Sequence, residues 1–251
     1  MNLKASSPRG RSRESKEESL RQLSARLLQL QDEERRKMAR NLHDVTGQKL
    51  AFQCMALSGI LAKHSGTMDA EMQRSLSESL LLNKEISDEV RTLSYWLHPP
   101  LLDELGLASA VRWYTTGFTK RTGIPVDLGV PSDMTRLSPE AEVAIFRVLQ
   151  ESLTNVHRYA NTSRARVRIQ TTAHELMLEI EDFGKGIQPA NTESTRESIE
   201  SLGIGIQGMT ERIRHLGGCL EITSNVNRGT LVSVTVPLSS PAVAVPPLAA
   251  L

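Results

Sequence analysis

The chain has 251 residues, 39% of them hydrophobic, which is enough for one large domain or two small domains with separate cores. Its 30 basic and 29 acidic residues give a formal net charge of +1, which argues against binding nucleic acid through a domain-wide positive field. Cys54 and Cys219 have no Cys-x-x-Cys spacing, so neither a disulfide framework nor a structural zinc site is predicted. The sequence contains no apolar run long enough to cross a bilayer and no apolar signal segment at its start. We therefore expect a cytoplasmic protein without direct membrane contact.

The first part of the chain is predicted to be helical. Residues 1–18 have almost nothing to bury and are expected to form a disordered lead-in. A leucine stripe then predicts one helix over about 19–64, and after the turn residues 64–69 a second helix runs until Pro99 and Pro100. Because a lone two-helix hairpin buries too little apolar surface, residues 19–100 are predicted to form a homodimer with a four-helix bundle.

Residues 101–238 are predicted to form an α+β sandwich, with helices on one face of a mixed sheet. Strand character is present in PVDLGV, RARVRIQTT, HELMLEIED and LEITSNVNRGTLVSVTVPL. One helix is predicted to start at the N-cap Ser138 with Pro139 in its first turn. A second helix covers IQGMTERIRH and ends at Gly217 and Gly218. Residues 239–251 are expected to be unstructured.

His43 and Asp44 lie in the middle of the first predicted helix. A lone histidine on a helix is most often a surface or packing residue, but three neighbours favour chemistry here. Asp44 can orient the imidazole and accept its proton, leaving the other ring nitrogen as a nucleophile. Gln48 shares the face of Asp44 and can position a water molecule, while Gly47 leaves room for a bulky partner. The spacing alone does not establish a reaction.

Polar residues in the second half form two further candidate groups. Glu151 and Asn155 are four residues apart on one helix, so both can face a cavity and hold a Mg²⁺ ion that bridges phosphates. An ordinary surface pair is the alternative. Asp182 ends a strand and is followed by a glycine-containing loop, which suits a planar ligand.

Glycines follow these candidates in two clusters. Gly184 and Gly186 belong to the loop after Asp182, and Gly203, Gly205 and Gly208 precede or open a helix whose N–H groups favour phosphate. Each glycine pattern alone is a weak signal. A dinucleotide-binding motif is not predicted, because no strand of a βαβ unit precedes the second cluster. Three patterns follow one another in the chain: the Glu151–Asn155 pair, Asp182 with its glycine loop, and the glycines at the second helix. This combination is much harder to obtain by chance than any one of the patterns.

The sequence resembles two-component sensor histidine kinases, in particular the subfamily typified by nitrate and lipid-fluidity sensors. The phosphoacceptor motif of that subfamily resembles ERRKMARNLHDVTGQKL, and its connector resembles LHPPLLDELGL. The N box and the two glycine boxes of the ATPase fold shared with gyrase, Hsp90 and MutL resemble QESLTNVHRYANTSRARVRI, EIEDFGKGI and LGIGIQGMTERIRHLGGCLEITSNVNRGTLVSVTVP. The resemblance covers roughly residues 20–238. It implies a dimerisation and phosphoacceptor domain over 19–100 and an ATP-binding catalytic domain over 101–238.

The resemblance also implies a role for each candidate residue. His43 would be the phosphoacceptor, Asp44 the base beside it, and Gln48 the residue that orients water when the partner is dephosphorylated. Asn155 would hold Mg²⁺ against the phosphates of ATP, with Glu151 as its neighbour. The remaining assignments concern the nucleotide. Asp182 would bind the adenine amine, Thr230 would support the adenine end, and Gly184 and Gly186 would admit the base. A mobile lid that includes residues 188–201 would be shaped by Gly203, Gly205 and Gly208.

Three residues depart from the pattern of the family: Thr46, Tyr159 and Arg228. None of them is expected to take part in the transfer itself.

The function implied is that of a homodimeric, ATP- and Mg²⁺-dependent protein-histidine kinase that passes the phosphoryl group to an aspartate of a response regulator. That regulator would have a DNA-binding helix-turn-helix output domain. A reverse phosphatase activity of the kinase on the phosphorylated regulator is also expected. The stimulus would come from a separate sensor protein or a preceding input region. The alternatives are a non-catalytic nucleotide-binding dimeric scaffold and a Ser/Thr kinase of the anti-sigma-factor type. His43, Asp44 and Gln48 argue against the latter.

Overall fold

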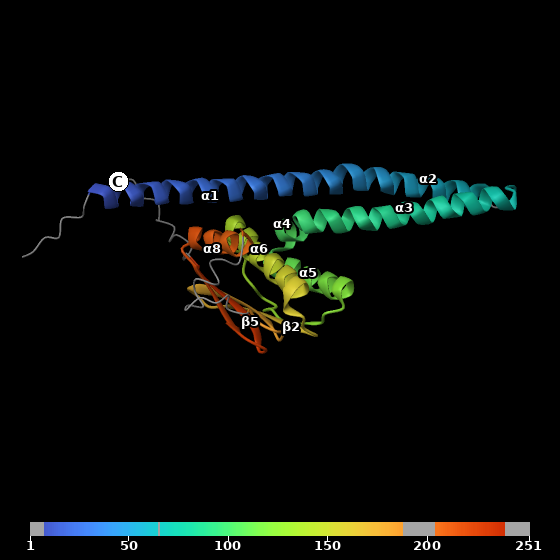
Figure 1. The fold of residues 1–251 in the computed structure, drawn as a ribbon. Coiled ribbons are helices and arrows are strands. Elements are labelled where there is room, and N and C mark those ends of the chain that lie inside the picture. The colour runs from blue at the N-terminus through green and yellow to red at the C-terminus, as the bar shows by residue number, and fades with distance from the viewer. Residues whose placement is uncertain (1–7, 65, 188–203, 239–251) are drawn as a thin grey trace, which may run out of the picture. The chain divides into compact units, whose positions relative to one another are not determined.

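The computed structural model describes residues 8–64, 66–187 and 204–238 (Figure 1). The chain divides into two compact units. The first, Gln29–Glu104, is called the helical unit below, and the residues from Leu105 onward belong to the second, the sheet unit. This division falls four residues after the predicted boundary between 100 and 101. Among the residues described, no helix combines the length and the apolar character that crossing a bilayer requires.

Helix α1 spans Pro8–Asn41, a π-helical segment η1 spans Leu42–Gly47, and helix α2 spans Gln48–His64. The lead-in predicted over residues 1–18 is therefore helical from Pro8 onward. Proline suits the first position of a helix, and the arginine, lysine and glutamate residues that follow are good helix formers. The scarcity of apolar residues in this stretch limits how much surface it can bury, but it does not prevent the stretch from forming a helix.

Helix α3 spans Ala70–Leu97 and packs against α2 and η1. It begins after Asp69, whose side chain accepts a hydrogen bond of 2.7 Å from the N–H of Met72. It ends just before Pro99, as predicted. Its buried and half-buried positions repeat at spacings of four and three, as expected for a helix seam: Leu76, Leu80, Asn83, Ser87, Val90 and Ser94.

The sheet unit contains one five-stranded mixed sheet, as predicted. The strands are β1 (Val126–Gly129), β2 (Ala165–Thr171), β3 (Glu175–Asp182), β4 (Cys219–Asn225) and β5 (Gly229–Pro237). Their order in the sheet is β1-β2-β3-β5-β4, with β1 parallel to β2 and the other pairs antiparallel. Asp182 is the last residue of β3, at the end of the sheet where β5 begins.

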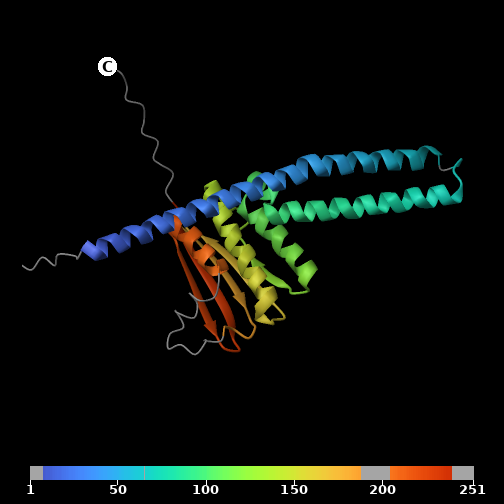
Figure 2. The same cartoon turned by 45° about the horizontal axis from the view of Figure 1, so that its top comes forward.

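Helices α5 (Leu107–Thr122), α6 (Pro139–Asn155) and α8 (Ile204–His215) cover one face of this sheet (Figure 2). Helix α6 starts as predicted: Ser138 accepts a hydrogen bond of 3.2 Å from the N–H of Ala141, and a proline is at its first position. Helix α8 also ends as predicted, because Gly217 has a positive φ of 72° and the N–H of Gly218 donates to the carbonyl of Ile213. The π-helical segment η2 (Val156–Ala160) extends α6.

Two helices were absent from the sequence prediction, α4 (Pro100–Leu105) and α5. Helix α5 contains threonines and a glycine, which lower its intrinsic propensity. It is held by packing instead: the rings of Tyr114 and Phe146 meet edge to face at a centroid distance of 5.5 Å. Burial raises the pKa of the Tyr114 phenol, so this side chain stays neutral in the core.

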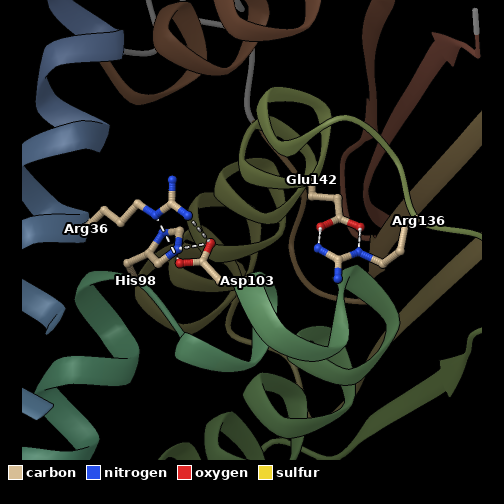
Figure 3. Close-up of polar contacts among 5 residues, drawn as sticks. All are labelled: Arg36, His98, Asp103, Arg136 and Glu142. Carbon is tan, nitrogen blue, oxygen red and sulfur yellow. Dashed lines mark hydrogen bonds and ion pairs between the residues drawn. The ribbon is translucent and has the colours of Figure 1, made fainter. Parts of the chain in front are cut away.

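A bidentate ion pair closes the start of α6. Glu142 is 2% exposed, and its two carboxylate oxygens accept hydrogen bonds of 2.9 Å from the guanidinium of Arg136 (Figure 3). The N–H of Leu137 donates to the same carboxylate at 3.3 Å. A buried carboxylate is tolerated only when it is paired in this way.

The variant Arg136→Ala should destabilise the sheet unit by about 3 kcal/mol, because it leaves the Glu142 charge buried without its partner. Chemical denaturation followed by circular dichroism measures the change. Arg214→Ala is the matched control, since Arg214 is exposed and pairs with Glu211 at 3.3 Å on the helix surface, where a pair contributes less than about 1 kcal/mol. Equal effects of the two variants would contradict this account of the pair.

Candidate active site

The predicted nucleophile lies on the π-helical segment η1. His43 and Asp44 are both exposed there, and Gln48, also exposed, is the first residue of α2. The predicted helix over 19–64 is thus continuous in its path, but six of its residues leave α-helical geometry. A π-turn closes over five residues rather than four, and π-turns occur frequently at functional sites. Because Gln48 follows His43 by five residues, the segment brings Gln48 toward the side of His43, which α-helical spacing alone does not.

The sheet unit contains a cavity of about 220 Å³ between α6, η2, α8 and the sheet. Its walls are mostly apolar. The lining residues are Ser152, Asn155, Val156, Tyr159, Ala160, Ile180, Asp182, Gly186, Ile187, Ile206, Met209, Ile222, Thr230 and Val232. Four predicted site residues, Asn155, Asp182, Gly186 and Thr230, are therefore brought together around one cavity.

The loop after β3 is held against the end of η2. The carboxylate Oδ1 of Asp182 accepts a hydrogen bond of 2.9 Å from the N–H of Gly184. The N–H of Lys185 donates to the carbonyl of Ala160 at 2.8 Å, and a side chain at Gly184 would overlap that same carbonyl. Gly186 has a positive φ of 69°, a conformation that favours glycine. The two glycines thus allow the loop to pass close to η2 and around the cavity.

A hydroxyl that the sequence analysis missed joins this loop to the neighbouring strands. Ser224 Oγ on β4 accepts a hydrogen bond of 2.8 Å from the N–H of Ile187 and lies 3.0 Å from the hydroxyl of Thr230. Ser224 also donates to the carbonyl of Gly229 at 3.1 Å. A serine in a strand has no distinctive spacing, so only its position opposite Thr230 in the β4–β5 pair could have indicated it.

Glu151 does not line the cavity but lies beside it, half-buried on α6. Its carboxylate occupies the space that a side chain at Gly205 would need. The glycine therefore lets the N-terminal turn of α8 approach α6 closely. Gly208 lies in α8, whereas Gly203 and the predicted lid 188–201 lie outside the described residues.

The three residues that depart from the family pattern are accommodated without disturbing these contacts. Tyr159 lines the cavity and is 62% exposed. Arg228 is exposed in the β4–β5 turn, where its N–H donates to the carbonyl of Asn225 at 3.0 Å. Thr46 is half-buried in η1.

No group of three or more His, Cys, Asp or Glu side chains in the described ranges is arranged to hold a metal ion by itself. On the α6 side of the cavity, the amide of Asn155 and the carboxylate of Glu151 are two hard oxygen donors. This donor set suits Mg²⁺, which commonly binds through one or two protein ligands together with phosphate oxygens and water. Such a cation would depend on a phosphorylated ligand.

A mixed sheet covered on one face by helices, with an acidic residue and a glycine loop at an apolar cavity, has the features of a nucleotide-binding domain. Residues 140–240 match the family described as "Histidine kinase-, DNA gyrase B-, and HSP90-like ATPase". Residues 34–102 match the family described as "Histidine kinase". The chain belongs to the histidine kinases, with the histidine-bearing domain first and the ATP-binding domain second.

Two curated relatives support this assignment. The chain is 32% identical over 219 residues to "Oxygen sensor histidine kinase NreB" of Staphylococcus carnosus, covering 87% of this chain and 60% of the relative. It is also 32% identical over 216 residues to "Signal transduction histidine-protein kinase/phosphatase DegS" of Brevibacillus brevis, covering 85% and 54%. The chain therefore spans between half and two thirds of the length of these relatives.

A solved structure is also similar, the histidine kinase domain of a blue-light activated histidine kinase from Erythrobacter litoralis. The sequence identity is 18% and the TM-score is 0.48, with 74% of this chain and 94% of that chain covered.

Proposed function

We propose that the chain is an ATP-dependent protein-histidine kinase that phosphorylates its own His43 and passes the phosphoryl group to an aspartate of a response regulator. The observation that carries this proposal is the combination of an exposed His-Asp pair on a π-turn with a nucleotide cavity in the same chain. We further propose that the regulator has a DNA-binding helix-turn-helix output domain. A separate sensor protein or an input region would supply the stimulus, and cytoplasmic ATP would supply the phosphoryl group.

The cavity suits the adenine of ATP. Ile180, Ile187 and Val232 provide apolar surface for the faces of a planar base. Asp182 is 6% exposed, and with Oδ1 bonded to Gly184, its second oxygen can accept a hydrogen bond from the exocyclic amine. The Thr230 hydroxyl, held by Ser224, would support the base from β5.

The phosphates would then extend toward α6 and α8. Asn155, with Glu151 as its neighbour, would hold Mg²⁺, which neutralises charge on the phosphates when it is bound. Gly205 and Gly208 lie in the first turns of α8, where unpaired N–H groups and the helix dipole favour phosphate oxygens. We propose that Gly203 belongs to the same phosphate-binding segment.

At the phosphoacceptor turn, a ring nitrogen of His43 would attack the γ-phosphorus in line, and the bond to the leaving ADP would break. Asp44 would orient the imidazole and accept its proton. Phosphoryl transfer needs positioning and charge neutralisation more than covalent help from the protein, so an exposed histidine on a defined turn is sufficient.

These assignments predict that two substitutions separate phosphorylation from ATP binding. His43→Gln should abolish autophosphorylation and leave ATP binding intact, because the nucleotide cavity is built only from the sheet unit. Asp182→Asn should weaken ATP binding about tenfold or more, because an acceptor for the adenine amine is replaced by a group that presents a donor. Labelled γ-phosphate incorporation and calorimetric ATP binding measure the two effects.

Label retained on the His43→Gln protein would contradict the assignment of the nucleophile, and unchanged ATP affinity of Asp182→Asn would contradict the placement of adenine. ATP binding by the unaltered chain without any phosphorylation would favour the non-catalytic scaffold instead.

A homodimer is part of this proposal and is supported by apolar side chains that the helical unit leaves uncovered. Phe52 and Met55 on α2 are 75% and 74% exposed. On α3, Met72, Ile86 and Leu93 are exposed at heptad-related positions. A second hairpin with the same stripes would complete a four-helix bundle.

Light scattering of the full chain at micromolar concentration should therefore report a dimer. Ile86→Asp should shift the chain toward the monomer, because it puts a charge into the apolar seam, whereas Glu85→Ala at the neighbouring exposed position should leave the mass unchanged. A monomeric parent chain, or a dimer that tolerates Ile86→Asp as well as Glu85→Ala, would refute the proposed seam.

We also propose that Gln48 serves a phosphatase reaction on the phosphorylated regulator. DegS, one of the relatives, is named a kinase/phosphatase. The exposed carboxamide of Gln48 at the end of the π-turn can hold a water molecule for in-line attack on the phospho-aspartate, a reaction that does not use the imidazole as nucleophile.

Gln48→Ala should then keep autophosphorylation largely intact and lose the acceleration of regulator dephosphorylation. The measurement is the decay rate of purified phosphorylated regulator with the parent chain or with the variant. Gln53→Ala, five residues further along α2 and bonded to Asn83, is the control. If Gln48→Ala accelerated the decay as well as the parent and the control, Gln48 would have no role in the reaction.

A further inference from the structure

Five residues link the helix turn before His43 to the end of α3 through hydrogen bonds. Arg36 and Ala39 belong to α1, Ser94 to α3, His98 follows α3 directly, and Asp103 lies in α4. We call them the positioning cluster. Figure 3 shows three of them, with the side chains of Arg36 and His98 both directed at the carboxylate of Asp103.

The buried end of the cluster acts on the backbone of α1. Ser94 is fully buried, and its hydroxyl donates to the carbonyl of Ala39 at 2.8 Å. In a regular α-helix that carbonyl accepts the N–H of the residue four positions later, which here is His43. A side-chain donor at such a carbonyl competes with the helix bond and is a recognised cause of local departure from α-helical geometry. The π-helical segment begins at Leu42, one residue before His43.

The other end of the cluster is an ion-paired clamp. The guanidinium of Arg36 binds both carboxylate oxygens of Asp103, each at 2.9 Å. His98 is 2% exposed, and its Nε2 lies 3.1 Å from Asp103 Oδ1. The backbone N–H of His98 donates to the carbonyl of Ser94 at 3.0 Å. Because Arg36 and Ala39 are three residues apart on α1, they share a face, and the contacts form a closed ring.

We propose that Ser94 and Asp103 are positioning residues for the phosphoryl-transfer reactions of His43: the ring of contacts holds the π-turn and so sets the direction in which His43 and Gln48 project. This inference rests on the proposed function. It assigns a role to the LHPPLLDELGL segment, which contains His98 and Asp103. It also gives the π-turn a physical cause.

The location of the cluster distinguishes it from ordinary packing. Directional polar contacts fix geometry, whereas apolar residues of similar size often stabilise a buried site equally well. Ser87 provides the comparison within the same helix. It lies one heptad before Ser94 on the same seam, but its hydroxyl donates to its own helix, at the carbonyl of Asn83, at 2.8 Å.

The test compares Ser94→Ala with the matched control Ser87→Ala in the full chain. The initial rate of His43 phosphorylation is measured over a range of ATP concentrations. Ser94→Ala should lower kcat about tenfold or more, in line with the sensitivity of transfer reactions to small misplacements, and leave KM for ATP unchanged. Ser87→Ala should change neither. Asp103→Asn should also lower kcat alone, with the exposed neighbour Glu104→Gln as its control.

Amide hydrogen exchange separates positioning from general support. Without the competing hydroxyl, residues 42–47 should return toward α-helical bonding in Ser94→Ala, so their exchange should slow although the kinase activity falls. A contact that merely supports the fold would give faster exchange when it is removed. Faster exchange, or a kcat equal to that of Ser87→Ala, would overturn the inference. A parent chain without phosphohistidine would instead refute the proposed function, and the exchange result would still decide whether Ser94 sets the π-turn.

Discussion

The helical unit is governed by one constraint: a two-helix hairpin has more apolar surface than it can cover by itself. Phe52 on α2 is three-quarters exposed, and the face of α3 that packs within the hairpin contains the polar residues Asn83, Ser87 and Ser94. Asn83 Oδ1 is the one buried side-chain oxygen or nitrogen in the described residues with no hydrogen-bond partner. Such a seam contributes less hydrophobic stabilisation than an all-leucine seam, and the proposed homodimer would cover the apolar side chains that the hairpin leaves exposed. The same polar positions provide the directional contacts near His43.

The sheet unit follows a different principle, because its cavity is shaped mainly by backbone contacts. The carbonyl of Ala160 receives the Lys185 N–H, and the N–H of Asn227 donates to the carbonyl of Lys185 at 2.8 Å. The loop after β3 is thus fixed on both sides before any ligand binds. A preformed cavity lowers the entropic cost of binding a nucleotide. The proposed phosphoacceptor His43, by contrast, is on an exposed helix turn, which suits a group that would have to meet both ATP and a partner protein.

The sequence predicted the structure correctly where a residue type or pattern is strongly associated with one local structure. Ser138 followed by proline predicted the start of α6, alternating apolar residues predicted the strands, and Asp182 with Gly184 predicted the loop at the cavity. The π-turn could not be predicted, because its cause is a hydroxyl on Ser94, about fifty residues away in the chain. Helix α5 was missed for a similar reason: tertiary packing of Tyr114 against Phe146 outweighs a weak propensity. Ser224 and the partners of Asp103 depend on contacts between segments that no spacing reveals.

Phosphosite mapping tests the central claim most directly, namely that this chain carries its phosphoryl group on His43. The full chain is incubated with ATP and Mg²⁺, digested at alkaline pH, and its peptides are sequenced by mass spectrometry. The account predicts one phosphorylated peptide, modified at His43, whose phosphate is lost in acid and survives alkali. Phosphate on another residue, or an acid-stable phosphoester, would contradict it.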